Sequence, residues 1–432
     1  MVTTSAGLER VVSRWQIVGI SLNAVIGSGV YLVPAAAAAL LGPASLWAVA
    51  LAGLAVLLLA LCFAEAGSHF AEPGAGYIYT RAAFGEFIGF QVGWMTWLAR
   101  IAGGAALWAG LAQTLTFVSP AAAAGFSRVA VITVPLVLLT VINIAGVKYA
   151  ARLEVIFAIA KIFPLLFFVA VGIPAIDASL IVPMAAPDPA GLGAAASLLL
   201  FAYAGFENTA AAAGEFKNPQ RDVPFALIIS IVAITLLYTL VQLVALGTLP
   251  DLAARTEGAA LADSITRTVG VWAGVILTLG AVVSIGGNIG NTVLVGPRYL
   301  FAMATSGFGP AALARIHPRF HTPAWAIAAQ AVVTGALALS GSFVQLAMLS
   351  IIARLATYIG TAAAVPVLRR RLTVGEHTIV LPGGATIPIL ALLVCLAFLA
   401  SATTGNLIAG GIALLAGAAV YFFRHDVAST DS

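Results

Sequence analysis

The sequence predicts an all-α, multi-pass membrane protein with about 12 transmembrane helices. Of its 432 residues, 62% are hydrophobic and only 8% are charged, and the mean hydropathy is +1.08. A soluble domain carries about 25% charged residues, so this composition excludes a soluble enzyme. The apolar runs do not alternate with polar residues as the strands of a membrane β-barrel do. Helices are therefore the expected spanning elements.

The individual spans follow from the length of the apolar runs. A helix needs about 20 mostly apolar residues to cross a hydrocarbon core of about 30 Å. Runs of this length lie between Pro, Gly and charged residues along the whole chain. The predicted spans are 15–40, 45–68, 84–117, 129–147, 153–174, 191–213, 223–248, 270–304, 324–341, 345–367, 386–402 and 406–423.

The distribution of Lys and Arg predicts that both termini are cytoplasmic, because short cytoplasmic loops carry an excess of these residues. With the N-terminus inside, only Arg128, Arg255 and Arg267 fall in loops on the outer side. We therefore expect a protein of the plasma (inner) membrane with cytoplasmic ends at 1–14 and 425–432. The net charge of +4 follows from this topology, and scattered basic residues predict no nucleic-acid partner.

Two spans share an unusual feature, a glycine interruption near the middle. Gly27-Ser28-Gly29 interrupts the first span, and Gly205 interrupts the sixth. The two spans are five helices apart, so the second has the opposite membrane orientation, which is the pattern of a five-plus-five inverted repeat with discontinuous helices 1 and 6. The predicted organisation is repeat one at 15–174, repeat two at 191–371 and two added helices at 386–424.

These interruptions predict a binding site, because non-helical backbone at membrane depth is tolerated where it lines a cavity. Free amides at Gly27, Ser28 and Gly29 suit a carboxylate, and carbonyls freed between Phe201 and Gly205 suit an ammonium group. An α-amino acid carries both groups. The alternative is that the glycines only allow close helix packing.

Several stretches carry a resemblance to a known family. They are 26–30, 65–79, 142–148, 201–224 and 296–298, of which the segment Glu215–Pro219 is the most specific. On these residues the chain resembles the amino acid-polyamine-organocation superfamily of secondary transporters over nearly all of its first ten helices. The resemblance implies secondary active transport of an amino acid by alternating access.

The resemblance also implies roles for individual residues. Backbone at Gly27, Ser28 and Gly29 would hold the substrate carboxylate. The carbonyls of Phe201, Ala202 and Ala204 would hold the amino group, and the Phe201 ring would gate the site. Packing is the other interpretation of Phe201.

Lys161 lies within the fifth predicted span, outside any loop. It resembles a lysine that one subgroup of the family places where sodium-coupled relatives bind a cation, and the resemblance implies the Asn23 carbonyl and the Ser284 hydroxyl as its neighbours. A tethered cation replaces sodium, and burial favours the neutral amine. We therefore expect sodium-independent transport that is coupled to protons or regulated by them. The alternatives are amino acid exchange without net proton coupling and a lysine that extends to the membrane surface.

Four more ionisable residues fall inside predicted spans, where a charge is costly. Arg100 either binds a substrate side chain or is neutralised by Glu65 or Glu207. Arg354 is expected in a structural or gating ion pair. Glu207 is expected in gating or proton relay, and the alternative is a structural role in which it ties down the interrupted segment. Glu65, near the inner end of the second span, is expected in an inner-gate or packing pair.

No enzyme, cofactor or metal site is predicted. The five histidines fall in predicted loops, and both cysteines, Cys62 and Cys395, lie in apolar runs. The stretch Gly286–Gly290 lacks the Lys and Ser/Thr of a phosphate loop, and the chain lacks the repeated filter element of a channel. The expected partners are an amino acid substrate and the lipid bilayer, without an obligate protein partner.

Overall fold

The computed structural model describes residues 13–70, 76–145, 150–182, 184, 186–211, 218–372 and 378–423, which form helices and turns and no strand. The helices are α1 (Arg14–Val25), α2 (Gly29–Leu41), α3 (Ser45–Ser68), α4 (Gly76–Phe84), α5 (Glu86–Thr114), α6 (Gly125–Ala145), α7 (Ala150–Gly172), α8 (Pro189–Ala202), α9 (Phe206–Ala211), α10 (Pro219–Thr248), α11 (Ala260–Val269), α12 (Val271–Thr305), α13 (Ala324–Ser340), α14 (Phe343–Arg371), α15 (Thr386–Ala400) and α16 (Thr404–Phe422). The predicted tail 425–432 and residues 1–12 of the predicted tail 1–14 lie outside the described residues.

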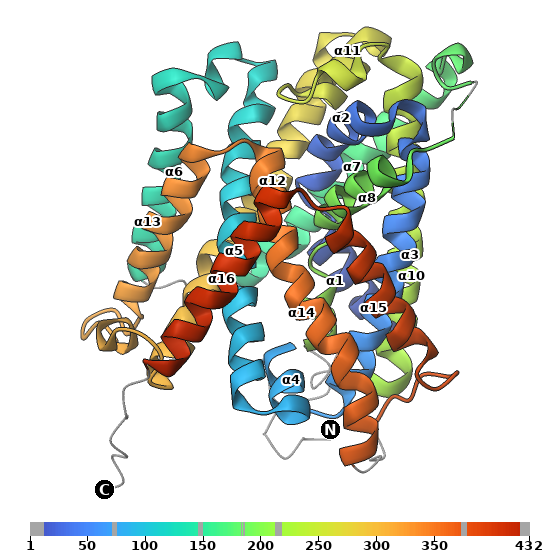
Figure 1. Cartoon of the computed structure of the whole chain (residues 1–432). Helices are drawn as coiled ribbons and strands as arrows, with labels where there is room; N and C mark the ends of the chain where they lie inside the picture. The colour runs from blue at the N-terminus through green and yellow to red at the C-terminus, as the bar shows by residue number, and fades with distance from the viewer. Residues whose placement is uncertain are drawn as a thin grey trace, which may run out of the picture.

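Every predicted span overlaps a helix or a pair of helices. The first span is divided into α1 and α2, and the sixth into α8 and α9. Two short helices, α4 and α11, lie where no span was predicted, and Figure 1 shows them at opposite ends of the bundle. Both are too short to cross a bilayer, which needs about 20 residues.

The surface of the bundle is apolar, as a membrane protein requires. Val134 and Leu138 on α6 and Val332 on α13 have 65%, 58% and 71% of their surface exposed. In the described part of the chain, six helical segments are long and apolar enough to cross a membrane, and four shorter apolar helices accompany them. The all-helical, multi-pass class is thereby supported, whereas the crossing of all twelve spans and the inverted repeat stay predictions.

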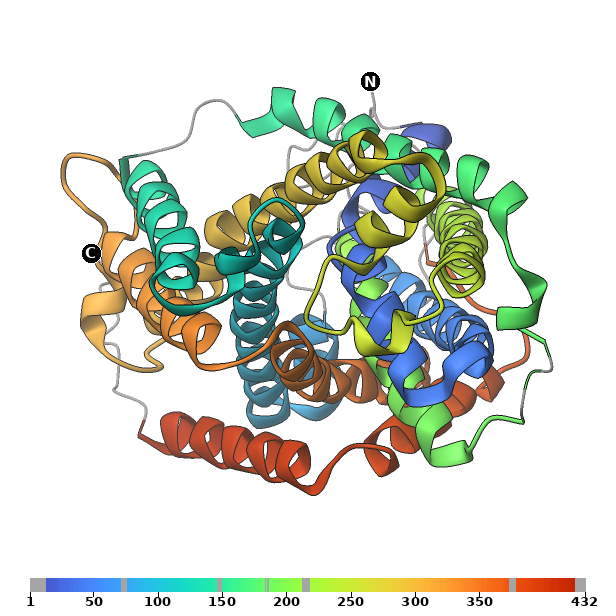
Figure 2. The same cartoon turned by 90° about the horizontal axis from the view of Figure 1, so that it is seen from above.

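The interior is built around α5, which packs along α14 and α12. On one side of α5 lie α6 and α13, and on the other lie α1, α2, α3, α8 and α10 (Figures 1 and 2). Seen from above, α15 and α16 run along one edge of the bundle (Figure 2). The interrupted helices therefore lie inside the bundle, and the last two helices lie at its periphery.

One close helix contact fixes the position of Lys161. A side chain at Gly280 of α12 would overlap the ring of Pro164 on α7, so only glycine allows this approach of the two helices. Lys161 precedes Pro164 by almost one turn, and Asn288 follows Gly280 by about two turns. The contact thus brings the Lys161 amine against α12.

Candidate functional site

A cavity of about 420 Å³ lies between the two interrupted helices and the helices α5, α7, α12 and α14. Most of the residues predicted for the site line it. These are Asn23, Gly27, Ser28, Gly29, Arg100, Lys161, Phe201, Ala202, Ala204, Glu207 and Arg354. Two predicted residues, Glu65 and Ser284, are not part of its wall.

The two helix interruptions pack against each other through glycines. A Cβ at Gly29, the first residue of α2, would overlap the backbone of Ala202, the last residue of α8. At the second interruption, a Cβ at Gly205 would overlap the carbonyl of Ala24 on α1. Gly205 also has a φ of 125°, which L-residues rarely adopt. The sequence allowed two interpretations of these glycines, close helix packing and backbone that lines a cavity. Gly29 and Gly205 do both, because they pack closely and also line the cavity.

The interruptions leave polar backbone groups at the cavity. The first amides of α2 have no intrahelical acceptor, and the buried Ser28 hydroxyl beside them has no partner among the described residues. At the other interruption, where α8 ends, the Phe201 carbonyl accepts from the Ala204 amide at 3.2 Å. The Ala202 carbonyl accepts from the Tyr238 hydroxyl at 3.0 Å. The Phe201 carbonyl also faces the Tyr203 amide, whereas the Ala202 carbonyl retains one lone pair for a further donor.

The cavity opens toward one end of the bundle. Ile20, Asn208 and Asn291 on its wall are exposed, whereas Phe201 and Leu107 are buried. The Phe201 ring packs edge-on against Phe343, the first residue of α14, with 5.5 Å between the ring centroids. Phe201 thus joins the cavity wall to the start of α14.

Lys161 is buried, with 4% of its surface exposed. Its amine donates to the Asn23 carbonyl at 3.4 Å and to Asn288 Oδ1 at 3.1 Å. The amine therefore joins α7 to α1 and to α12. The contact with the Asn23 carbonyl, an expected neighbour, is present. The Ser284 hydroxyl, the other expected neighbour, makes no hydrogen bond in the described structure. Asn288 lies one turn further along α12, and its longer side chain reaches the amine.

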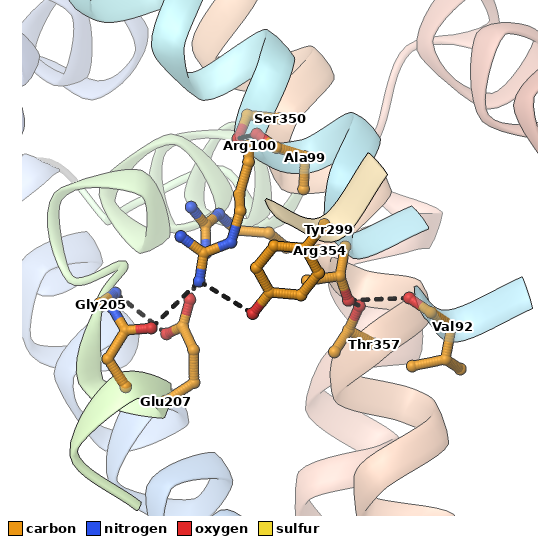
Figure 3. Close-up of polar contacts among 11 residues, drawn as sticks. Val92, Ala99, Arg100, Gly205, Glu207, Tyr299, Ser350, Arg354 and Thr357 are labelled. Carbon is orange, nitrogen blue, oxygen red and sulfur yellow. Dashed lines mark hydrogen bonds and ion pairs between the residues drawn. The ribbon is translucent and has the colours of Figure 1, made fainter. Parts of the chain in front are cut away.

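Glu207 forms an ion pair with Arg354 on α14. The second carboxylate oxygen, Oε2, accepts from the Gly205 amide at 3.0 Å, so this side chain replaces a backbone hydrogen bond that the interruption removes. In Figure 3 the Glu207 carboxylate points toward the arginine side chains. One carboxylate thus stabilises the interruption and ties α9 to α14.

Arg100 has neutral partners. Its Nη2 donates to Asn208 Oδ1 at 3.1 Å and to the Tyr299 hydroxyl at 3.4 Å, and the guanidinium carbon lies 4.8 Å from the centre of the Tyr299 ring (Figure 3). The ion pairs of the described residues do not include Arg100. Of the carboxylates offered as partners of Arg100, Glu207 pairs with Arg354 and Glu65 pairs with Arg369 in the described structure.

Glu65 lies at the end of the bundle where α3 ends. Its carboxylate accepts two hydrogen bonds from Arg369 on α14, of which the bond from Nη2 to Oε2 is 2.7 Å long, and a third from the Leu381 amide at 3.1 Å. A bidentate pair of this kind is geometrically specific. Glu65 therefore joins α3 to α14 and to the segment before α15, away from the cavity.

The sequence reasoning missed Asn208, Asn288 and Tyr299, which contact Arg100 or Lys161. Asn288 belongs to the stretch Gly286–Gly290, which was considered only as a phosphate loop. Ser284, Asn288 and Asn291 follow each other at helical spacing along α12. Polar residues at this spacing on one face of an apolar helix were the sequence signal that could have indicated Asn288.

Comparison with known proteins decides the family. A family model described as amino acid permease matches residues 12–421. The chain belongs to the amino acid permease family, within the amino acid-polyamine-organocation superfamily.

Several curated relatives of this permease align over nearly the whole chain. The branched-chain amino acid permease BcaP of Bacillus subtilis is 28% identical, over 96% of this permease and 93% of that protein. The methylthioribose transporter of the same organism is 29% identical, over 97% and 94% of the two chains. The serine/threonine exchanger SteT, also from Bacillus subtilis, is 29% identical over 97% of each chain. These relatives are transport proteins, and this permease is accordingly a transporter rather than an enzyme.

Proposed function

We propose that this permease is a secondary active amino acid transporter of the plasma membrane that works by alternating access without sodium. The observation that carries the proposal is the buried Lys161 amine, which donates to α1 and α12 at 3.4 and 3.1 Å. A tethered ammonium there supplies the positive charge that a bound sodium ion would otherwise supply between these helices. Transport would then need no sodium.

Proton coupling or proton regulation follows from the same contacts. Burial in a low-dielectric environment favours the neutral form of an amine in general, and a neutral Lys161 would hold the Asn23 carbonyl and Asn288 less strongly. Its proton therefore biases how α1 packs against α12. We propose that this bias favours one face of the transport cycle.

The substrate site that we propose lies at the two interruptions. The amides that begin α2 and the Ser28 hydroxyl would bind the carboxylate, and the free lone pairs near Phe201 and Ala202 would accept from the ammonium group. A helix N-terminus favours an anion, which supports this orientation. The reciprocal packing of Gly29 on Ala202 and of Gly205 on Ala24 supports an inverted repeat that relates the two interruptions.

Two side-chain contacts are proposed as gates. The Phe201–Phe343 pair would close the outer end, and the Glu65–Arg369 pair would form part of the inner end. Under the predicted topology, the start of α10 lies inside, and the cavity opens toward that end. The structure then corresponds to an inward-facing state.

Amino acid exchange is the second candidate, and it is favoured by the 29% identity with a serine/threonine exchanger over 97% of each chain. Preloading the proteoliposomes with amino acid distinguishes exchange from net transport. Exchange requires amino acid inside the vesicle, whereas net transport proceeds into empty vesicles.

The test is uptake of a panel of labelled amino acids into proteoliposomes, with sodium replaced by choline. The proposal predicts saturable uptake of at least one amino acid at an undiminished rate in choline. A requirement for sodium, or the absence of uptake and exchange for the whole panel, contradicts it.

A further inference from the structure

The charges that line the cavity do not balance. Among the described lining residues, Arg100, Lys161 and Arg354 are cations, and Glu207 is the carboxylate. The ion pair between Arg354 and Glu207 neutralises two of these charges. Arg100 is outside this pair, and its printed hydrogen-bond partners are neutral oxygen atoms.

Arg100 and Lys161 differ in what they can still bind. The Lys161 amine lies between oxygen atoms of two helices, where it serves a structural contact. Arg100 has a buried Nε–H group without a partner, and its bonds to Asn208 and Tyr299 both leave from Nη2. A guanidinium carries five N–H donors in a planar fork that matches a carboxylate. Arg100 therefore keeps donors for an anionic ligand.

Unsatisfied polar atoms also lie at the interruption of the first span. The Ser28 hydroxyl and the Asn23 Oδ1 atom are buried and have no partner in the described structure, and both residues line the cavity. Buried polar groups are usually hydrogen-bonded in folded proteins, so these two atoms are available to a polar ligand in the cavity. The cavity thus offers polar groups at the interruption and, separately, a cationic donor at Arg100.

We propose, on the basis of the amino acid transport proposed above, that the substrate is an acidic amino acid with a second carboxylate on its side chain. The α-carboxylate and ammonium groups bind at the interruptions, and the side-chain carboxylate binds Arg100. An α-amino acid without a charged side chain is electrically neutral and leaves the Arg100 charge uncompensated when the cavity closes and loses its water. An acidic amino acid carries one net negative charge, which compensates Arg100.

The charge balance also excludes two other substrate classes. A cationic amino acid would add a second positive charge beside Arg100, which pairs with no carboxylate among the described residues. A branched aliphatic side chain would bury the Arg100 donors without an acceptor, and an unsatisfied charged donor is costly.

The experiment compares acids with their amides, which have nearly the same shape. The purified full-length protein is titrated with L-glutamate, L-glutamine, L-aspartate and L-asparagine, and Kd is measured together with competition against labelled uptake in proteoliposomes. At least one acid should bind about tenfold to a hundredfold more tightly than its amide, which is the range expected for a charge-assisted hydrogen bond. Arg100→Gln should reduce this ratio to about threefold or less, while the Kd of the amide stays within about threefold.

Arg267→Gln is the matched control, because Arg267 is exposed on α11 and away from the cavity. The acid-to-amide ratio of this variant should equal that of the unmodified protein.

If the unmodified protein binds neutral or cationic amino acids and shows no preference for an acid over its amide, the inference fails while the proposed transport stands. A preference that persists in Arg100→Gln also overturns it. If no amino acid binds or is transported, the proposed function fails and the inference with it. The comparison of each acid with its amide in the unmodified protein tests the proposed substrate class even if Arg100→Gln does not fold.

Discussion

Each buried charge at the cavity has defined neighbours, and these neighbours determine what its removal does. Lys161 is held by Asn23 and Asn288, and Glu207 is held by Arg354 and the Gly205 amide. In the first arrangement the amine donates to oxygen atoms on two helices, so a loss of its proton is expected to weaken both contacts. The second combines opposite charges, so it is expected to be mainly a mechanical link between α9 and α14.

Asn288→Asp tests the Lys161 contact. A carboxylate at this position favours the protonated amine, so transport should become less dependent on pH than in the unmodified protein. The measurement is the initial rate of uptake across a pH series. Ser284→Ala is the control, because the Ser284 hydroxyl makes no hydrogen bond and its removal should leave the profile unchanged. An effect of Ser284→Ala larger than that of Asn288→Asp would contradict the assignment.

The ion pair between Glu207 and Arg354 predicts a non-additive pair of substitutions. Glu207→Gln and Arg354→Gln each leave one uncompensated charge, which costs up to about 3–5 kcal/mol for a buried pair. The double substitution leaves no charge, so its thermal unfolding midpoint in detergent should lie above that of at least one single variant. Strictly additive losses in the double variant would show that the two side chains do not interact.

At the scale of elements, the two interruptions form one packed unit. Gly29 meets Ala202, and Gly205 meets Ala24, so α2 is fixed against α8 and α1 against the start of α9. Ser21 on α1 also donates to Thr209 on α9 at 3.0 Å. Any change that separates these helices should alter the cavity between them.

Gly29→Ala is the substitution that tests this unit. Its methyl group would overlap the Ala202 backbone, which cannot give way as a flexible side chain does, so substrate affinity and thermal stability should both fall. Gly19→Ala on α1 is the matched control, since nothing lies within 4 Å of a Cβ there, and uptake should stay normal. Normal substrate binding by Gly29→Ala would show that the two interruptions are not tightly packed.

At the scale of the whole molecule, much of the helical layout could be predicted from the sequence because apolar length and glycine interruptions are local properties. The divisions at Gly27-Ser28-Gly29 and at Gly205 are examples. The partners of Arg100 and Glu65 could not be predicted, because ion pairs across the bundle depend on which faces of α5, α3 and α14 meet. Asn288 was missed for the same reason, since the close approach of Gly280 to Pro164 sets its distance from Lys161.

The membrane topology is testable on intact cells by single cysteines. Arg370 is exposed at the end of α14 and Arg267 is exposed on α11, which the charge distribution predicts to lie on opposite sides. Arg267→Cys should react with an impermeant thiol reagent added outside, and Arg370→Cys should not. The native Cys62 and Cys395 are buried and should give a low background. Labelling of Arg370→Cys from outside would contradict the predicted orientation.

The pH profile of sodium-free uptake in proteoliposomes, measured for the unmodified protein, Lys161→Ala and Lys161→Arg, tests the central claim most directly. Uptake by the unmodified protein should proceed without sodium and change with pH, because protonation of Lys161 sets its hold on α1 and α12. Lys161→Ala, which cannot carry the charge, and Lys161→Arg, which always carries it, should both lose this pH dependence. A sodium requirement in the unmodified protein, or a pH profile that Lys161→Ala leaves unchanged, would contradict the account.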